Sequence, residues 1–244
     1  MTHVPPPNPL AAQARRSFVT ITDLTDPTAV GDTIQVVELD AVQLESRPFQ
    51  ARRVTVNLET LVLVFHSTNS AIRTRTRLSA DFVAFSVFGP SARGSLNGLL
   101  VGPDLVFAGG PGVEVEFAVS AGYESVALLL PCTELQRELR NRHRPNKCPL
   151  PRSSQLLQPA DAAARGLYKF SRRLVDLAVR QPEVFDLHQP RTIAQAELLD
   201  FLLAALESVE QARSTPQDRS RLSYSRVVQT AEDYVLARAG DDFT

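Results

Sequence analysis

The amino-acid sequence predicts an α+β protein in which a β barrel or sandwich is followed by a helical segment. Residues 18–131 alternate apolar and polar side chains with the period of two that is typical of strands, and turns rich in glycine and proline separate the runs. After Pro131 the apolar residues recur every three or four positions, which is the period of an amphipathic helix. A hydrophobic content of 43% in 244 residues is enough for a sizeable core.

The clearest strand signal is the run GVEVEFAVS. Its valines and its phenylalanine fall on one face of an extended segment, and Glu114 and Glu116 fall on the other. Turn signals occur at residues 102–104 and at residues 109–112. Many short strands joined in this way indicate two packed sheets or a closed barrel.

The bulk properties predict a cytoplasmic protein. No apolar run approaches the 18 or so residues that a membrane-spanning helix needs, so we expect no contact with a membrane. Residues 1–17 contain four prolines within the first nine positions and no apolar signal region, which predicts a disordered tail. Cys132 and Cys148 have no metal-type spacing and are interpreted as ordinary thiols. A net charge of -1 disfavours nucleic-acid binding over the whole surface.

Residues 132–213 are predicted to be helical. The first helix is expected to begin with a capping box formed by Thr133 and Gln136. The last helix has a wide apolar stripe, made by Ile193, Leu199, Leu202, Leu203, Leu206 and Val209. Two interpretations stay open: this helix covers the open face of the sheet, or the helices of residues 159–213 also form the seam of a homodimer.

A linker and a last helix, residues 214–244, carry a family resemblance. The stretch SRVVQTAEDYVLARAGDDFT resembles the first helix of the DNA-binding domain in AraC-family transcription regulators. The matching positions are Arg226, Val227, Val228, Ala231, Tyr234 and Thr244. The β-rich half and the helices after it are similar to the cupin-like sensor region of that family.

This resemblance implies an effector-binding domain at residues 18–131 and a helical dimerisation segment at 132–213. It also implies that the DNA-binding domain is truncated after its first helix, because the helices that would enter the major groove are absent. We therefore expect a homodimeric sensor region that controls DNA binding only through the absent C-terminal domain.

A cupin-like barrel also raises the possibility of a metal enzyme. Such sites need three or four converging ligands, usually histidines and a carboxylate. The chain has four histidines, and only His66 lies on a predicted strand, with no second histidine two residues away. We therefore expect no metal, no cofactor and no enzymatic activity.

Three arginines stand out in the stretch HSTNSAIRTRTRLSADF. Arg73, Arg75 and Arg77 alternate with threonines, so they share one side of an extended segment and form a comb of positive charge. The pattern predicts a connection between two strands in which the arginines either face water or bind an anion that relieves the repulsion between them.

The arginines and a later stretch, RGSLNG, are together similar to the two-part motif by which PilZ domains bind cyclic di-GMP. Arg93 stands where that motif has Asp or Asn. Arginine binds phosphate and the O6 and N7 atoms of guanine in a bidentate manner, so the chemistry suits an anionic nucleotide. The resemblance therefore implies cyclic di-GMP as candidate effector and an effector site made of Arg73, Arg75, Arg77, Arg93, Ser95, Asn97 and Gly98.

Two alternatives remain at this stage. A small organic effector could bind inside the barrel, whose predicted strands carry five phenylalanines: Phe82, Phe85, Phe88, Phe107 and Phe117. Those side chains would equally suit a filled core. The arginines could also simply face water without binding any ligand.

Overall fold

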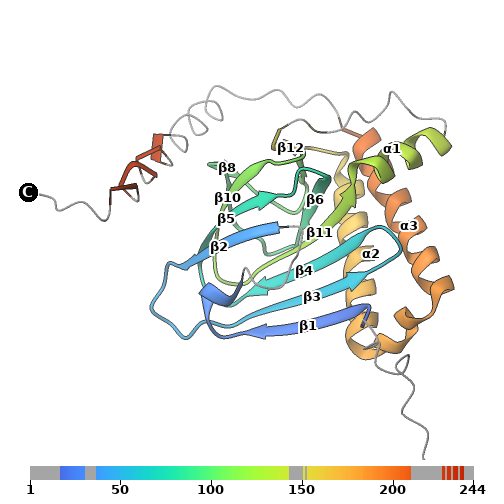
Figure 1. Cartoon of the computed structure of the whole chain (residues 1–244), viewed down its shortest axis with the longest axis horizontal. Coiled ribbons are helices and arrows are strands. Elements are labelled where there is room, and N and C mark those ends of the chain that lie inside the picture. The colour runs from blue at the N-terminus through green and yellow to red at the C-terminus, as the bar shows by residue number, and fades with distance from the viewer. Residues whose placement is uncertain are drawn as a thin grey trace, which may run out of the picture.

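The computed structural model describes residues 17–30, 37–142, 151 and 153–209, and nine positions between 227 and 238. These residues form three layers: a five-stranded sheet, a seven-stranded sheet and a pair of long helices that cover the outer face of the seven-stranded sheet (Figure 1). The predicted order, a β-rich half followed by helices, is confirmed.

The seven-stranded sheet is the central layer. All its pairings are antiparallel. In spatial order it contains β1 (Val19–Leu24), β3 (Ala51–Asn57), β4 (Val62–Thr68), β11 (Tyr123–Pro131), β6 (Phe82–Phe88), β9 (Val106–Gly109) and β12 (Gln155–Leu157). Strand β12 lies inside the segment that the sequence predicted to be helical, so that prediction is wrong there. Its three residues pair with β9, whose outer edge would otherwise be open.

The five-stranded sheet packs against the other face of this central layer. In spatial order it contains β2 (Val37–Gln43), β5 (Ile72–Leu78), β10 (Glu114–Val119), β7 (Gly94–Leu96) and β8 (Leu99–Leu100). Because its side chains alternate, Val115 and Val119 are buried between the sheets while Glu114 points outward.

Within residues 17–209, as far as the structure describes them, the helices are α1 (Cys132–Asn141), α2 (Asp161–Arg180) and α3 (His188–Glu207). The same range contains two short 3-10 helices, η2 (Pro27–Val30) and η3 (Pro182–Asp186). The capping box predicted for α1 is wrong. Helix α1 begins directly after β11, its N-cap residue is Pro131, and no side chain caps it. Thr133 therefore lies within the first turn and cannot act as the cap.

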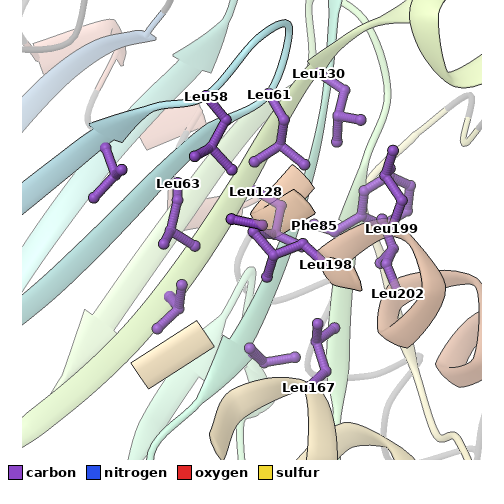
Figure 2. Packing of buried hydrophobic residues seen from close by; sticks show 14 of the residues in the cluster. Leu58, Leu61, Leu63, Phe85, Leu128, Leu130, Leu167, Leu198, Leu199 and Leu202 are labelled. Carbon is purple, nitrogen blue, oxygen red and sulfur yellow. The ribbon is translucent and has the colours of Figure 1, made fainter. Parts of the chain in front are cut away.

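The leucines of the apolar stripe on α3 pack against the central sheet of the same chain, whereas Ile193 of that stripe is 51% exposed. Leu198, Leu199, Leu202 and Leu203 are at most 2% exposed. They meet leucines of the strands and Leu167 of α2 in one continuous cluster (Figure 2). These leucines are therefore core residues and are not free to form a dimer seam. The homodimer stays a prediction, and it would have to use other side chains.

Several sequence predictions concern residues outside the described ranges. They include the disordered tail up to residue 16, the linker, and two positions of the regulator-like segment, Arg226 and Thr244. Cys148 also lies outside, as do His3 and His143.

The central sheet separates two hydrophobic clusters, and this arrangement positions the candidate site. Along β4, Leu63 and Phe65 belong to the cluster that faces the helices. Val64 belongs to the cluster between the two sheets, and His66 lies on the same face as Val64.

Candidate functional site

A cavity of about 140 Å³ lies between the two sheets. Its apolar wall includes Val64, Leu129 and Phe107 from the central sheet and Val115 and Phe117 from the five-stranded sheet. The rings of Phe107 and Phe117 meet edge to face, with their centroids 5.8 Å apart. A mostly apolar cavity with a few polar groups is the usual form of a small-molecule site.

The polar part of the cavity begins with a row of side chains across the central sheet. The strand register pairs Arg53 of β3 with His66 of β4, and His66 with Ser125 of β11. Directly paired residues share one face of a sheet, so all three side chains point toward the five-stranded sheet. His66 and Ser125 line the cavity, and Arg53 is only 1% exposed beside them.

Hydroxyl groups complete the polar lining. Thr74 and Thr76 of β5 contribute theirs from the opposite sheet, and Ser86 of β6 lies diagonally across from Ser125. Tyr123 is buried at 8% exposure, and burial raises the pKa of its hydroxyl above the usual range. The Tyr123 hydroxyl therefore stays protonated at neutral pH. The cavity thus offers hydrogen bonds from several sides within an apolar shell.

Arg53 and His66 form the most unusual contact of the site. The Nε–H of Arg53 donates a hydrogen bond to Nε2 of His66 over 2.9 Å. Burial, together with the charge of Arg53, lowers the pKa of His66 to about 3. Burial lowers the pKa of Arg53 to about 10. At neutral pH the arginine is therefore still charged, and the histidine is neutral.

The predicted arginine comb lies inside a strand and not in a connection. Arg73, Arg75 and Arg77 belong to β5 and alternate with cavity-facing threonines, so the arginines point away from the cavity. The prediction that they share one side is confirmed by this register. The two neighbouring strands, β2 and β10, lie on either side of them.

Each of the three arginines forms an ion pair with a carboxylate of the same chain. Arg73 Nη2 lies 2.6 Å from Glu116 Oε2, and Arg77 is paired with Glu114, which raises the pKa of the Arg77 guanidinium. Arg75 Nη1 lies 2.7 Å from Asp233 Oδ1 in the C-terminal segment. These contacts answer the electrostatic question that the sequence raised: carboxylates of the chain itself offset the repulsion between like charges.

The second part of the predicted motif lies on the same sheet. Ala118 of β10 pairs with Arg73 on one side and with Ser95 of β7 on the other. The two parts of the motif are therefore not on adjacent strands, because β10 lies between them. Two strand spacings amount to about 10 Å. Arg93 donates to the carbonyl of Ala92 over 2.9 Å.

Asn97 and Gly98 form the turn between β7 and β8. Both have positive φ, 47° for Asn97 and 83° for Gly98, as a type I′ hairpin turn requires. The Asn97 side chain accepts from the backbone N–H of Glu116 over 2.8 Å and donates to Ser154 Oγ over 3.0 Å. In this structure the two residues therefore shape and anchor a turn.

The five phenylalanines suggested for the barrel divide among several positions. Phe107 and Phe117 line the cavity. Phe85 faces the helices, and Phe88 is buried between the sheets without lining the cavity. Phe82 is only partly buried at the edge of the same cluster. The barrel interior is thus aromatic in part, as expected for an apolar ligand site.

Sequence reasoning missed most of the polar lining. Thr74 and Thr76 could have been found, because residues that alternate with outward-facing arginines must point inward. The contact between Arg53 and His66 had no signal in the sequence, because it depends on how β3 and β4 pair. Within the described residues, no group of three or more His, Cys, Asp or Glu side chains is arranged to hold a metal ion. No described helix is long and apolar enough to cross a membrane.

Comparison with known proteins gives similarity in structure only. No model of a protein family matches the chain, and no curated protein sequence matches it. A crystal structure of the AraC-like transcriptional activator CuxR is similar over 84% of this chain and 72% of that chain, with 15% identity and a TM-score of 0.47. A structure of oxalate decarboxylase is similar over 42% of this chain and 31% of that chain, with 15% identity and a TM-score of 0.21. At these identities and TM-scores, neither similarity assigns the chain to a family.

Proposed function

We propose that this chain is the sensor region of an AraC-like transcription regulator and binds a small organic effector between its two sheets. The cavity with its polar row is the observation that carries the proposal. An engineered cavity of about 150 Å³ in another protein takes up benzene, so a cavity of this size suits a molecule with one ring or a short branched chain.

The C-terminal segment supports the regulatory part of the proposal. Four apolar side chains in this segment are each 49–64% exposed: Val227, Val228, Tyr234 and Val235. A helix that packs against the rest of a DNA-binding domain would present such a face. The resemblance of this segment to the first helix of that domain points to the same role.

Contacts that connect the cavity wall to helix α2 support a role in sensing a ligand. On β4, His66 lines the cavity, and its neighbour Phe65 lies 4.5 Å from the guanidinium of Arg172 on α2, measured to the ring centroid. On β11, Ser125 lines the cavity, and its neighbour Glu124 accepts a hydrogen bond of 2.8 Å from Tyr168 on α2. A ligand that shifts these two strands would therefore move groups that contact α2.

A thermal-shift screen with small ring compounds tests the proposal. A true effector at one hundred times its dissociation constant adds about 2.7 kcal/mol to the stability of the native state. The variant Ala127→Leu fills the cavity and should lose the response. Its matched control is Ala118→Leu, the same substitution on the outward side of β10, which should keep it. A response that survives in Ala127→Leu would place the ligand elsewhere.

The second candidate effector is an anionic nucleotide, with cyclic di-GMP first, bound at the arginines of β5. What favours it is that both parts of the motif lie on one sheet, with one strand between them. Arg75 also contacts Asp233 of the C-terminal segment, so an anion that took the place of Asp233 would act directly on the region next to the DNA-binding part.

The carboxylates around the arginines make the anionic nucleotide the weaker of the two candidates. A surface groove of about 550 Å³ beside Arg75 and Arg77 is lined by two arginines and four carboxylates, and an anionic ligand would have to displace or neutralise the latter. Calorimetry with cyclic di-GMP should show at least tenfold weaker binding in Arg73→Ala and Arg77→Ala. Arg52→Ala removes an exposed, ion-paired arginine elsewhere and serves as the control. Equal affinity of all variants and the wild type for cyclic di-GMP would exclude the arginines of β5 as its binding site.

The regulator would act as a homodimer through the exposed sides of α2 and α3. Phe201 is 40% exposed and stacks on Phe170 with centroids 4.8 Å apart, and Ile193 is 51% exposed. Sedimentation of the wild type and of Phe201→Asp tests this. A wild type that remains monomeric at high concentration, with and without effector, would exclude the dimer.

A further inference from the structure

The contact between Arg53 and His66 fixes where the histidine carries its proton. A guanidinium has donors only, so the Nε2 atom that faces Arg53 Nε must be the acceptor. A neutral imidazole has one proton, and with Nε2 accepting, that proton sits on Nδ1. The strand register therefore sets the tautomer of a side chain in the cavity wall.

The Nδ1–H group is then a donor available to a ligand. The ring of His66 lines the cavity, and its Nε2 atom is already engaged by Arg53. Serine and threonine hydroxyls elsewhere in the wall can rotate to donate or to accept. His66 cannot reverse its role while Arg53 holds Nε2. Unlike the hydroxyls of the wall, His66 therefore has a fixed hydrogen-bonding sense toward the cavity.

The positive charge of Arg53 also favours a ligand that accepts a hydrogen bond over a ligand that carries a cation. Its guanidinium is buried next to the ring and faces the same space between the sheets. A ligand cation at this end of the cavity would meet a like charge in a poorly solvated place. Protonation of His66 is disfavoured for the same reason, so the ring does not become a cation at physiological pH.

We propose that the cavity selects ligands that carry an acceptor oxygen, and that the Nδ1–H of His66 donates to this oxygen. The ligand class is a molecule with about one ring and a carbonyl or comparable oxygen, and molecules with an ammonium group are excluded. This inference rests on the proposed function, since it assigns the chemistry of the same cavity.

Two probes of nearly equal shape test the inference. Acetophenone has a carbonyl oxygen, and α-methylstyrene has a CH₂ group in its place. Calorimetry should show that the wild type binds both, with acetophenone about threefold to tenfold tighter, the range expected for one neutral hydrogen bond. Benzylamine, a cation at neutral pH, should not bind. Benzoate, measured in parallel, tells whether a neutral or an anionic oxygen is preferred.

Three variants locate the donor. His66→Leu removes it and should abolish the preference for acetophenone. In His66→Gln the amide oxygen can accept from Arg53 while the amide N–H donates, so part of the preference should remain. Thr20→Val removes an exposed hydroxyl of β1, outside the cavity, and should leave the preference intact. If His66→Leu fails to fold, ¹⁵N NMR of the wild-type imidazole decides, and a proton found on Nε2 overturns the inference.

The outcomes separate the two proposals. Equal affinity of wild type for acetophenone and α-methylstyrene, or a preference that persists in His66→Leu, overturns the role of His66 and leaves the cavity as an effector site. If none of the ring probes binds while Ala127→Leu and wild type behave alike, the proposed function falls, and this inference falls with it.

Discussion

The two faces of the central sheet differ in how completely they are covered. Toward the helices, alternate residues such as Leu63 and Phe65 belong to the same hydrophobic cluster as the leucines of α2 and α3. Figure 2 shows Leu63 and Leu128 in this cluster. Toward the five-stranded sheet, the residues between them, such as Val64 and His66, line a cavity with a buried arginine beside it. One sheet is thus densely packed on one face and leaves a cavity on the other.

The reason lies in the partner of each face. Helix side chains such as Leu198 and Leu202 are long, and they fill the grooves of the sheet. The five-stranded sheet offers threonines and valines, for example Thr74 and Val115, which are shorter and leave space. Hydroxyls and a neutral histidine line this space. The comparison predicts that substitutions on the two faces have different costs.

The largest effect is expected for the packed face. Leu202→Ala should lower the free energy of unfolding by about 2–5 kcal/mol, because Leu202 is fully buried and its removal leaves a void between α3 and the sheet. Denaturant titration measures this. A loss well below this range would mean that the helices cover the sheet only loosely and that the two faces are alike.

Replacing one alanine by leucine on each face of the central sheet compares the two faces directly. Ala108→Leu puts extra volume into the packed cluster and should cost about 1–3 kcal/mol. Ala127→Leu puts the same atoms into the cavity and should cost less than about 1 kcal/mol. Thermal unfolding of the two variants gives the comparison. Similar losses of stability in both variants would contradict the presence of a cavity between the sheets that can take up the added atoms.

His66 should make stability depend on pH. The unfolded chain takes up a proton at this histidine near its ordinary pKa of 6.5, and the folded protein does so only near pH 3. The unfolded state therefore gains protons first, and stability falls as the pH drops from about 6.5 toward 3. Between pH 6.5 and 5 we expect a loss of roughly 1–2 kcal/mol. Parallel titrations of wild type and His66→Gln should show this loss only in the wild type.

The smallest effect is expected outside both clusters, on the outward face of β5. Arg77→Ala removes an exposed ion pair with Glu114, and such pairs contribute little because water screens them. The melting temperature of the ligand-free protein should stay unchanged within error, at low and at high salt. A clearly lower melting temperature would show that the arginines stabilise the fold, which would argue against a site retained only for ligand binding.

The sequence alone determined the elements whose signal is local. The period of two across residues 18–131 and its change after Pro131 reflect only how side chains alternate along a strand or a helix. Asn97-Gly98 is also a local hairpin signal, since these residues tolerate positive φ, but the prediction assigned them to an effector motif instead. The shared side of Arg73, Arg75 and Arg77 follows from the same alternation. The predicted capping box failed because a start one residue after Pro131 left Thr133 inside the helix.

Only the tertiary structure decided which distant residues meet. The arginines of β5 face carboxylates because β2 and β10 pair with that strand, more than thirty residues away in either direction. Arg53 meets His66 because β3 and β4 pair in one register, and a shift by one residue would turn the two side chains to opposite faces. The cavity depends on the fit between two sheets, and periodicity within one strand carries no information about the volume that a facing strand leaves unfilled.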